Sequence, residues 1–145
     1  MSYYDDLENV LSYIAMSDGF DGSRLIAKLD RYLSRGASLL ELGMGAGKDY
    51  EILSERYSVT GSDRSRVFLN LYKEKDPSAE LLEIDAADLK IDILFEGIYS
   101  NKVLHHLSRE ELKRSFTRQS ALLKPGGIAM HSFWAGMGDD EHNGL

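Results

Sequence analysis

Apolar residues along the chain follow two alternating patterns, which together predict a regular succession of strands and helices. Short aliphatic runs that end at a glycine or an acidic residue are typical of buried strands. Between these runs, apolar residues recur every three or four positions, which is the spacing of one helix face. The predicted strands are residues 38–42, 58–62, 80–84, 97–101 and 128–134. The predicted helices are residues 3–16, 25–33, 48–57, 66–75 and 108–124.

This alternation predicts an α/β fold: a Rossmann-like parallel sheet with flanking helices. Strands that alternate with helices of about 10–15 residues form β-α-β crossovers, and these crossovers make neighbouring strands parallel. Such sheets bind ligands beyond the carboxyl ends of their strands. The residues with the most distinctive chemistry all fall at predicted strand ends, namely Gly43, Asp63, Asp85 and Asn101. We therefore expect a binding site at that edge.

The helix predicted from Ser108 has clear signals at both ends. Ser108 and Glu111 form the pattern of a capping box, in which each side chain binds a free backbone N–H at the helix start. The Pro-Gly-Gly sequence at residues 125–127 is typical of a helix end. We expect the last strand to follow this turn directly.

Three glycines at alternate positions follow the first predicted strand. Gly43, Gly45 and Gly47 permit positive φ in a tight turn and leave no Cβ between the backbone and a ligand. The helix predicted just beyond them offers unpaired N–H groups to an anionic group. This glycine loop, residues 43–47, is the predicted centre of the binding site.

The glycine spacing separates several cofactor classes. A nucleotide P-loop would need glycine where Leu42 stands and a hydroxyl residue where Asp49 stands, so that interpretation fails twice. The dinucleotide fingerprint would place its third glycine one residue later than Gly47. The dinucleotide interpretation is weakened by this difference and stays open.

Composition narrows the class of protein. The 145 residues correspond to one domain, and 17 basic against 24 acidic residues give a net charge of −7, which argues against a nucleic-acid-binding surface. The absence of cysteine excludes disulfides, thiolate nucleophiles and thiolate metal ligands. No apolar run approaches ~20 residues, so no transmembrane helix is expected, and the N-terminus lacks a secretory signal. We expect a soluble cytoplasmic protein.

Residues 41–47, Glu-Leu-Gly-Met-Gly-Ala-Gly, resemble the first motif of class I S-adenosylmethionine-dependent methyltransferases. Residues 98–107, which contain Leu-His-His-Leu, resemble the fourth motif of that family and the segment after it. The Lys-Pro-Gly-Gly turn at residues 124–127 resembles the family's turn before the fifth strand. The resemblance extends over residues 38–133 in the expected order.

The resemblance implies S-adenosylmethionine as the cofactor and a small molecule as the methyl acceptor. It places the glycine loop against the methionine part, Asp63 on the ribose and Asp85 with Ala86 on the adenine, and gives Glu41 the role of orienting the loop or the amino end. An acid at the end of the second strand would equally suit a nicotinamide cofactor. The residues implied in cofactor binding are Glu41, Leu42, Gly43, Met44, Gly45, Gly47, Asp63, Arg64, Asp85, Ala86 and Asn101.

Histidines provide the candidate acid–base chemistry. His105 and His106 are adjacent, and adjacent side chains point in different directions on a helix or strand, so no shared metal site is expected. His131 and His142 are not at ligand spacing with them. The candidate general base is His106, facing the acceptor, while His105 is expected to pack over the sheet end.

The predicted organisation is an N-terminal helical cap at residues 1–37, a cofactor-binding core at 38–135 and a tail at 136–145. The family's usual C-terminal antiparallel strand pair has no counterpart in this tail. Two explanations stay open: the sequence is cut short at this point, or the fifth strand is an exposed sheet edge that a partner or a second copy covers. Two functions stay open beside methyl transfer. They are a non-catalytic cofactor-binding module or subunit, and an NAD(P)-dependent oxidoreductase.

Overall fold

The computed structural model describes residues 22–133, so the predicted helix at 3–16 and the tail lie outside the described residues. The strands are β1 (Ser38–Leu42), β2 (Ser58–Asp63), β3 (Leu81–Glu83), β4 (Phe95–Asn101) and β5 (Leu123–Ser132). The helices are α2 (Ser23–Leu29), α3 (Lys48–Ser54), α4 (Arg66–Lys75), the short 3-10 helix η2 (Leu104–His106) and α5 (Arg109–Leu122). None of the helices described is long and apolar enough to cross a membrane.

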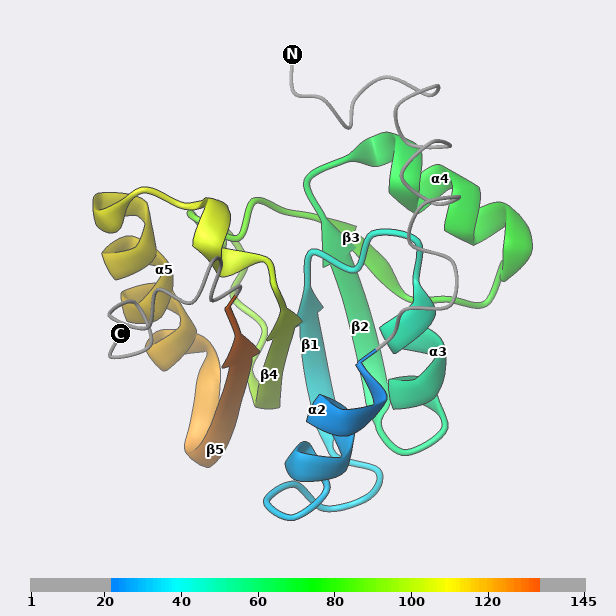
Figure 1. The fold of residues 1–145 in the computed structure, drawn as a ribbon, viewed down its shortest axis with the longest axis horizontal. Coiled ribbons are helices and arrows are strands. Elements are labelled where there is room, and N and C mark those ends of the chain that lie inside the picture. Colours follow the sequence, from blue (N-terminus) through cyan, green and yellow to red (C-terminus); the bar gives the residue numbers. More distant parts are fainter. Residues whose placement is uncertain (1–21, 134–145) are drawn as a thin grey trace.

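The strands of residues 22–133 form one sheet in the order β3-β2-β1-β4-β5, and every neighbouring pair is parallel (Figure 1). The chain builds outward from β1 to β3 and then returns to place β4 on the other side of β1. Ligands of open parallel sheets bind where the strand order reverses in this way. The carboxyl ends of β1 and β4 are therefore the expected position of a site.

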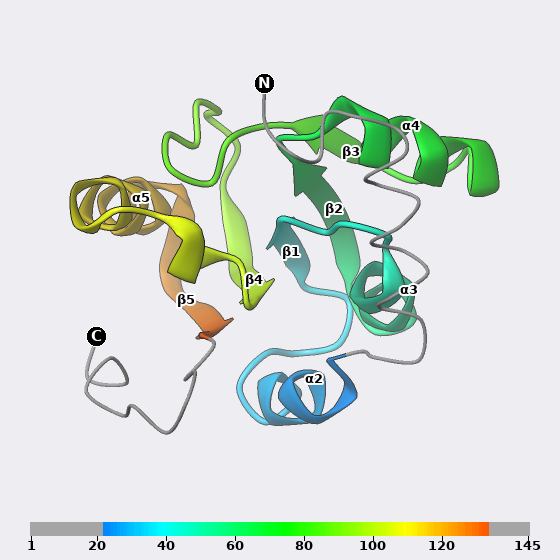
Figure 2. The same cartoon turned by 45° about the horizontal axis from the view of Figure 1, so that its top comes forward.

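Neighbouring residues of β1 point to opposite faces of the sheet and belong to two different hydrophobic clusters, one on each face. Leu39 belongs to a cluster with side chains of α2 and α3, whereas Leu40 belongs to a cluster with Leu112 and Leu122 of α5. Figure 2 shows the corresponding arrangement, with α5 on the side of the sheet away from α2 and α3. Because both faces are covered, four of the five residues of β1 are buried, including Glu41.

The predicted Rossmann-like class is confirmed, and the differences concern element ends. The capping box of α5 is present, with Ser108 Oγ accepting from Glu111 N and Glu111 Oε1 accepting from Ser108 N. The predicted start of the last strand is wrong, because α5 ends at Leu122 and the pairing of β5 with β4 already begins at Leu123. The pairing is interrupted by residues 124–127 and resumes at Ile128. The turn motif is thus an irregularity within β5 rather than the boundary of a helix.

Gly47 shows why the loop after β1 needs glycine. It is the N-cap of α3 with φ +89°, and a Cβ at this position would overlap the ring of Tyr72 from α4. Gly36 has a similar φ of +82° but no atom within 4 Å of the position of a Cβ. A substitution at Gly36 therefore introduces backbone strain alone, whereas a substitution at Gly47 introduces backbone strain and steric overlap.

Replacement of Gly47 by alanine is expected to lower the free energy of unfolding more than replacement of Gly36. Gly36→Ala should cost about 1–2 kcal/mol for the left-handed backbone alone. Gly47→Ala should cost about 1–3 kcal/mol more, because the buried Tyr72 ring must move. Urea unfolding of both variants measures the difference, and equal losses would contradict this role of the ring.

Candidate functional site

The glycine loop leaves β1 through three left-handed residues. Gly43, Gly45 and Gly47 have φ values of +64°, +53° and +89°. The turn is closed by backbone hydrogen bonds, in which Met44 N donates to Ser62 O at 2.8 Å and Gly47 N donates to Met44 O at 2.9 Å. The loop is thereby fastened to β2 and leads directly into α3.

Asp63, at the end of β2, lies against this loop. Its Oδ2 accepts from Gly45 N at 2.9 Å, and its Oδ1 accepts from Ser65 N at 2.8 Å, where Ser65 caps α4. Burial raises the pKa of Asp63, while the hydrogen bonds from Ser65 and Gly45 oppose this effect. The structure therefore brings the predicted ribose-binding acid and the predicted methionine-binding loop into direct contact.

Glu41 is the most deeply buried acid of the site. It lies in β1 just before the loop, and its Oε1 has no hydrogen-bond partner. Burial raises the pKa of Glu41 well above its ordinary value, and the nearby charges of Asp49 and Asp63 raise it further. An unpartnered buried carboxyl oxygen is costly, so it marks a position where a donor is missing.

A chain of hydrogen bonds joins the start of α3 to the ends of β4 and β5. Asp49 is buried and accepts from Gly22 N at 2.6 Å, from Tyr99 Oη at 2.7 Å and from Asn101 Nδ2 at 3.1 Å. Asn101 Oδ1 in turn accepts from Ser132 Oγ at 2.5 Å. Both ends of the Asn101 amide are thereby engaged within the protein.

The segment after β4 packs directly on the glycine loop. A Cβ on Gly43 would lie 2.7 Å from the methyl carbons of Val103, so only glycine allows this approach. Lys102 precedes it with a φ of +58°, a conformation that non-glycine residues rarely adopt. The sequence offered no sign of Val103, because an apolar residue after a strand is most simply explained as core.

His106 is exposed in η2, while His105 is half-buried beside it. The expectation that their side chains point apart is wrong, because their ring centroids are 4.0 Å apart in this tight helix. Burial, followed by the positive charges of His106 and Lys102, lowers the pKa of His105. Among residues 22–133, no three His, Asp or Glu side chains are grouped so that they could hold a metal ion.

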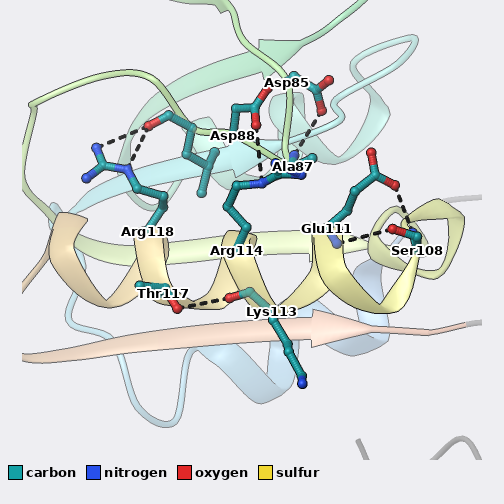
Figure 3. Close-up of polar contacts among 10 residues, drawn as sticks. Asp85, Ala87, Asp88, Ser108, Glu111, Lys113, Arg114, Thr117 and Arg118 are labelled. Carbon is teal, nitrogen blue, oxygen red and sulfur yellow. Dashed lines mark hydrogen bonds and ion pairs between the residues drawn. The ribbon is translucent and has the colours of Figure 1, made fainter.

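Asp85 and Ala86 begin a tight turn after β3, and both are half-buried. Asp85 Oδ1 accepts from Ala87 N at 2.9 Å, which Figure 3 shows, and Asp85 O accepts from Asp88 N at 3.0 Å and Leu89 N at 2.9 Å. Asp85 thus caps its own turn at the carboxyl edge of the sheet. This is the position at which the family resemblance expects the adenine.

Three of the remaining predicted residues differ in accessibility. Leu42 and Met44 are buried, Leu42 in the cluster on the α5 face and Met44 in the cluster on the other face. Arg64 is exposed. Any ligand contact of Leu42 or Met44 would therefore be through the main chain, whereas the Arg64 side chain is accessible.

A second polar chain, which sequence reasoning missed, links α5 to β4 and β5. His131 Nδ1 lies 2.6 Å from Ser100 Oγ, and His131 Nε2 lies 2.6 Å from Gln119 Oε1, whose Nε2 donates to Ser115 Oγ at 3.0 Å. Since Gln119 Oε1 can only accept, Nε2 carries the proton of a neutral imidazole. Burial lowers the pKa of His131 to about 4.

His131 is expected to make stability depend on pH. Its pKa is about 4 when folded and about 6.5 when unfolded, so below pH 6.5 the unfolded chain binds more protons and stability falls as pH falls. The loss between about pH 7 and pH 5 should be about 2 kcal/mol. Urea unfolding of the wild type and of His131→Gln tests this. The variant should lack this part of the pH dependence, and His106→Gln serves as the exposed control.

Comparison with known proteins relates this geometry to a family. Residues 39–127 match the family model described as a methyltransferase domain. The chain belongs to the methyltransferase domain family. This membership confirms the predicted resemblance to class I S-adenosylmethionine-dependent methyltransferases. No curated protein matches the chain in sequence.

Solved methyltransferase structures resemble most of the chain. The TehB-like S-adenosylmethionine-dependent methyltransferase of Corynebacterium glutamicum is 26% identical, with 92% of this chain and 77% of that one covered and a TM-score of 0.72. The sugar N-methyltransferase KedS8 of a Streptoalloteichus species is 17% identical, with 88% and 55% covered and a TM-score of 0.77. CalS10 of Micromonospora echinaspora, an amino pentose methyltransferase with bound S-adenosylmethionine, is 20% identical, with 86% and 56% covered and a TM-score of 0.73.

The two sugar methyltransferases share less than a quarter of their residues with this methyltransferase-family chain, so they establish its fold alone. The chain spans little more than half of their length.

Proposed function

We propose that this chain binds S-adenosylmethionine at the carboxyl ends of β1 to β4 and serves in methyl transfer to a small-molecule acceptor. The glycine loop would lie along the methionine part, Asp63 would bind the ribose, and Asp85 with Ala86 would bind the adenine. The bound S-adenosylmethionine of CalS10, a structure of the same fold, supports this choice of cofactor.

The observation that carries the proposal is the group of buried acidic side chains beside the loop. Burial and the nearby charges of Asp49 and Asp63 raise the pKa of Glu41, and Glu41 Oε1 lacks a hydrogen-bond donor. S-adenosylmethionine has an ammonium and a sulfonium group, and a cation at this place would supply the missing donor and lower the pKa of Glu41. The diphosphate of a nicotinamide dinucleotide would instead meet carboxylates. The site therefore favours the cationic cofactor.

The contribution of the chain to catalysis would be mainly positional. When bound, S-adenosylmethionine supplies an electrophilic methyl group, and alignment with the acceptor provides much of the acceleration. Val103 packs on Gly43 and thereby holds η2 beside the loop. His106, exposed on η2, is the residue we propose to take a proton from the acceptor.

A sugar is the first acceptor class to test. KedS8 and CalS10, which share the fold, are named as sugar and amino pentose methyltransferases. No observation on residues 22–133 favours a non-catalytic module over an enzyme. Coverage of the β5 edge by a second copy stays a prediction, which the mass of the protein in solution would test.

The choice of cofactor predicts selective stabilisation by S-adenosylhomocysteine. At about 100 times its dissociation constant the compound should add about 2.7 kcal/mol to the free energy of unfolding, and so raise the melting temperature by several degrees. NAD at the same concentration should leave it unchanged. Thermal unfolding monitored by fluorescence measures both, and stabilisation by NAD alone would overturn the proposal.

Glu41→Gln is expected to weaken binding of S-adenosylhomocysteine by about 10- to 100-fold, because a hydrogen bond to a charged group contributes about 1.5–3 kcal/mol. Titration calorimetry measures the change. Glu55→Gln is the matched control, since Glu55 is an exposed acid just after α3. Equal affinities of the two variants would show that Glu41 does not face the cofactor.

A further inference from the structure

Leu89, in the segment between β3 and β4, has a backbone conformation that side chains disfavour. Its φ is +48°, and it is completely buried in the cluster on the α5 face. Its N–H donates to Asp85 O at 2.9 Å, and its carbonyl accepts from Ile91 N at 2.9 Å. Such a conformation persists only where the surrounding structure holds it.

Arg118 of α5 supplies that support. Its Nε and Nη2 donate to Leu89 O at 3.3 and 3.2 Å, and Nη2 also donates to Ile91 O at 2.8 Å. Figure 3 shows the guanidinium of Arg118 reaching out from α5, with hydrogen bonds drawn as dashed lines. A planar, rigid guanidinium can fix two neighbouring carbonyl groups at once, which the single ammonium of lysine does less well.

The strained residue belongs to the same turn as the proposed adenine site. Asp85 O accepts from both Asp88 N and Leu89 N, so the backbone of Asp85 is tied to Leu89. Asp85 Oδ1 in turn binds Ala87 N across Ala86. A change in the conformation of Leu89 would therefore shift Asp85 and Ala86, the residues assigned to the adenine.

We propose that Arg118 is a positioning residue, which holds Leu89 and Ile91 so that Asp85 and Ala86 are preorganised for the adenine of the cofactor. This inference rests on the proposed function. Arg118 lies on α5 and acts on the turn through the backbone carbonyl groups of Leu89 and Ile91. Helix α5 thus sets the shape of a cofactor site to which it contributes no cofactor-binding residue of its own.

Arg114 provides a matched control on the same helix, one turn before Arg118. Its Nε lies 3.4 Å from Asp88 Oδ1, in an ion pair whose side chains are 53% and 36% exposed. Exposed pairs of this kind contribute little, so its loss should leave the turn in place. Both arginines line an open cleft of about 400 Å³ together with Asp88, Lys90 and Ile91, so a small guanidinium compound can enter beside Ile91, whose carbonyl group Arg118 binds.

The test measures binding of S-adenosylhomocysteine and of adenosine to the full chain by titration calorimetry. Arg118→Ala should weaken both ligands at least tenfold and by the same factor, because both contain adenine. Ethylguanidinium should restore most of the affinity of Arg118→Ala and leave the wild type unchanged. Arg114→Ala should change either affinity less than twofold.

The possible outcomes separate the two proposals. Unchanged affinity in Arg118→Ala, or a loss confined to S-adenosylhomocysteine, would overturn the role of Arg118 while leaving the cofactor proposal standing. Failure of the wild type to bind either ligand would overturn both. If the alanine variant does not fold, Arg118→Lys replaces it. That variant should bind both ligands at least fivefold more weakly, and wild-type affinity would refute the proposal.

Discussion

The turn that follows β1 is the constraint on which the rest of the structure depends. Its left-handed glycines let the chain leave the central strand and enter α3 within a few residues. Because glycine has no Cβ, other side chains can pack directly against the turn. Val103 packs beside Gly43, and the ring of Tyr72 packs beside Gly47. One backbone feature therefore positions α3, α4 and the segment after β4 around the same edge of the sheet.

Carboxylates surround this turn, and their environments differ. Asp63 and Asp49 each accept hydrogen bonds from the backbone, which offset part of the cost of burial. Glu41 Oε1 accepts no hydrogen bond, and the cost of burying this carboxyl group raises the pKa of Glu41. Natural proteins retain such strain mainly at functional sites, so the unpaired oxygen is the strongest structural support for a cationic ligand at this position.

The half of the sheet beyond β1 is held together by polar contacts as well as by packing. Asn101 and Ser132 are joined on one side of the β4–β5 pair, and the neighbouring residues Ser100 and His131 are joined on the other. His131 of the second pair is also hydrogen-bonded to Gln119 of α5. From α5, Arg118 then holds the segment that leads away from β3. The strand ends that carry the proposed site are thereby connected through side chains of one helix.

The sequence by itself determined the fold class and the motif positions, because periodicity, glycine spacing and capping residues are local signals. It located the glycine loop and Asp63 at strand ends, and it placed Asp85 close to the end of β3, which the structure ends at Glu83. Tertiary structure alone decided the contacts of Asp49, Val103 and Arg118, whose partners lie far away in the sequence. Burial and hydrogen bonding of a polar side chain depend on which elements pack against it, and no local pattern records that choice.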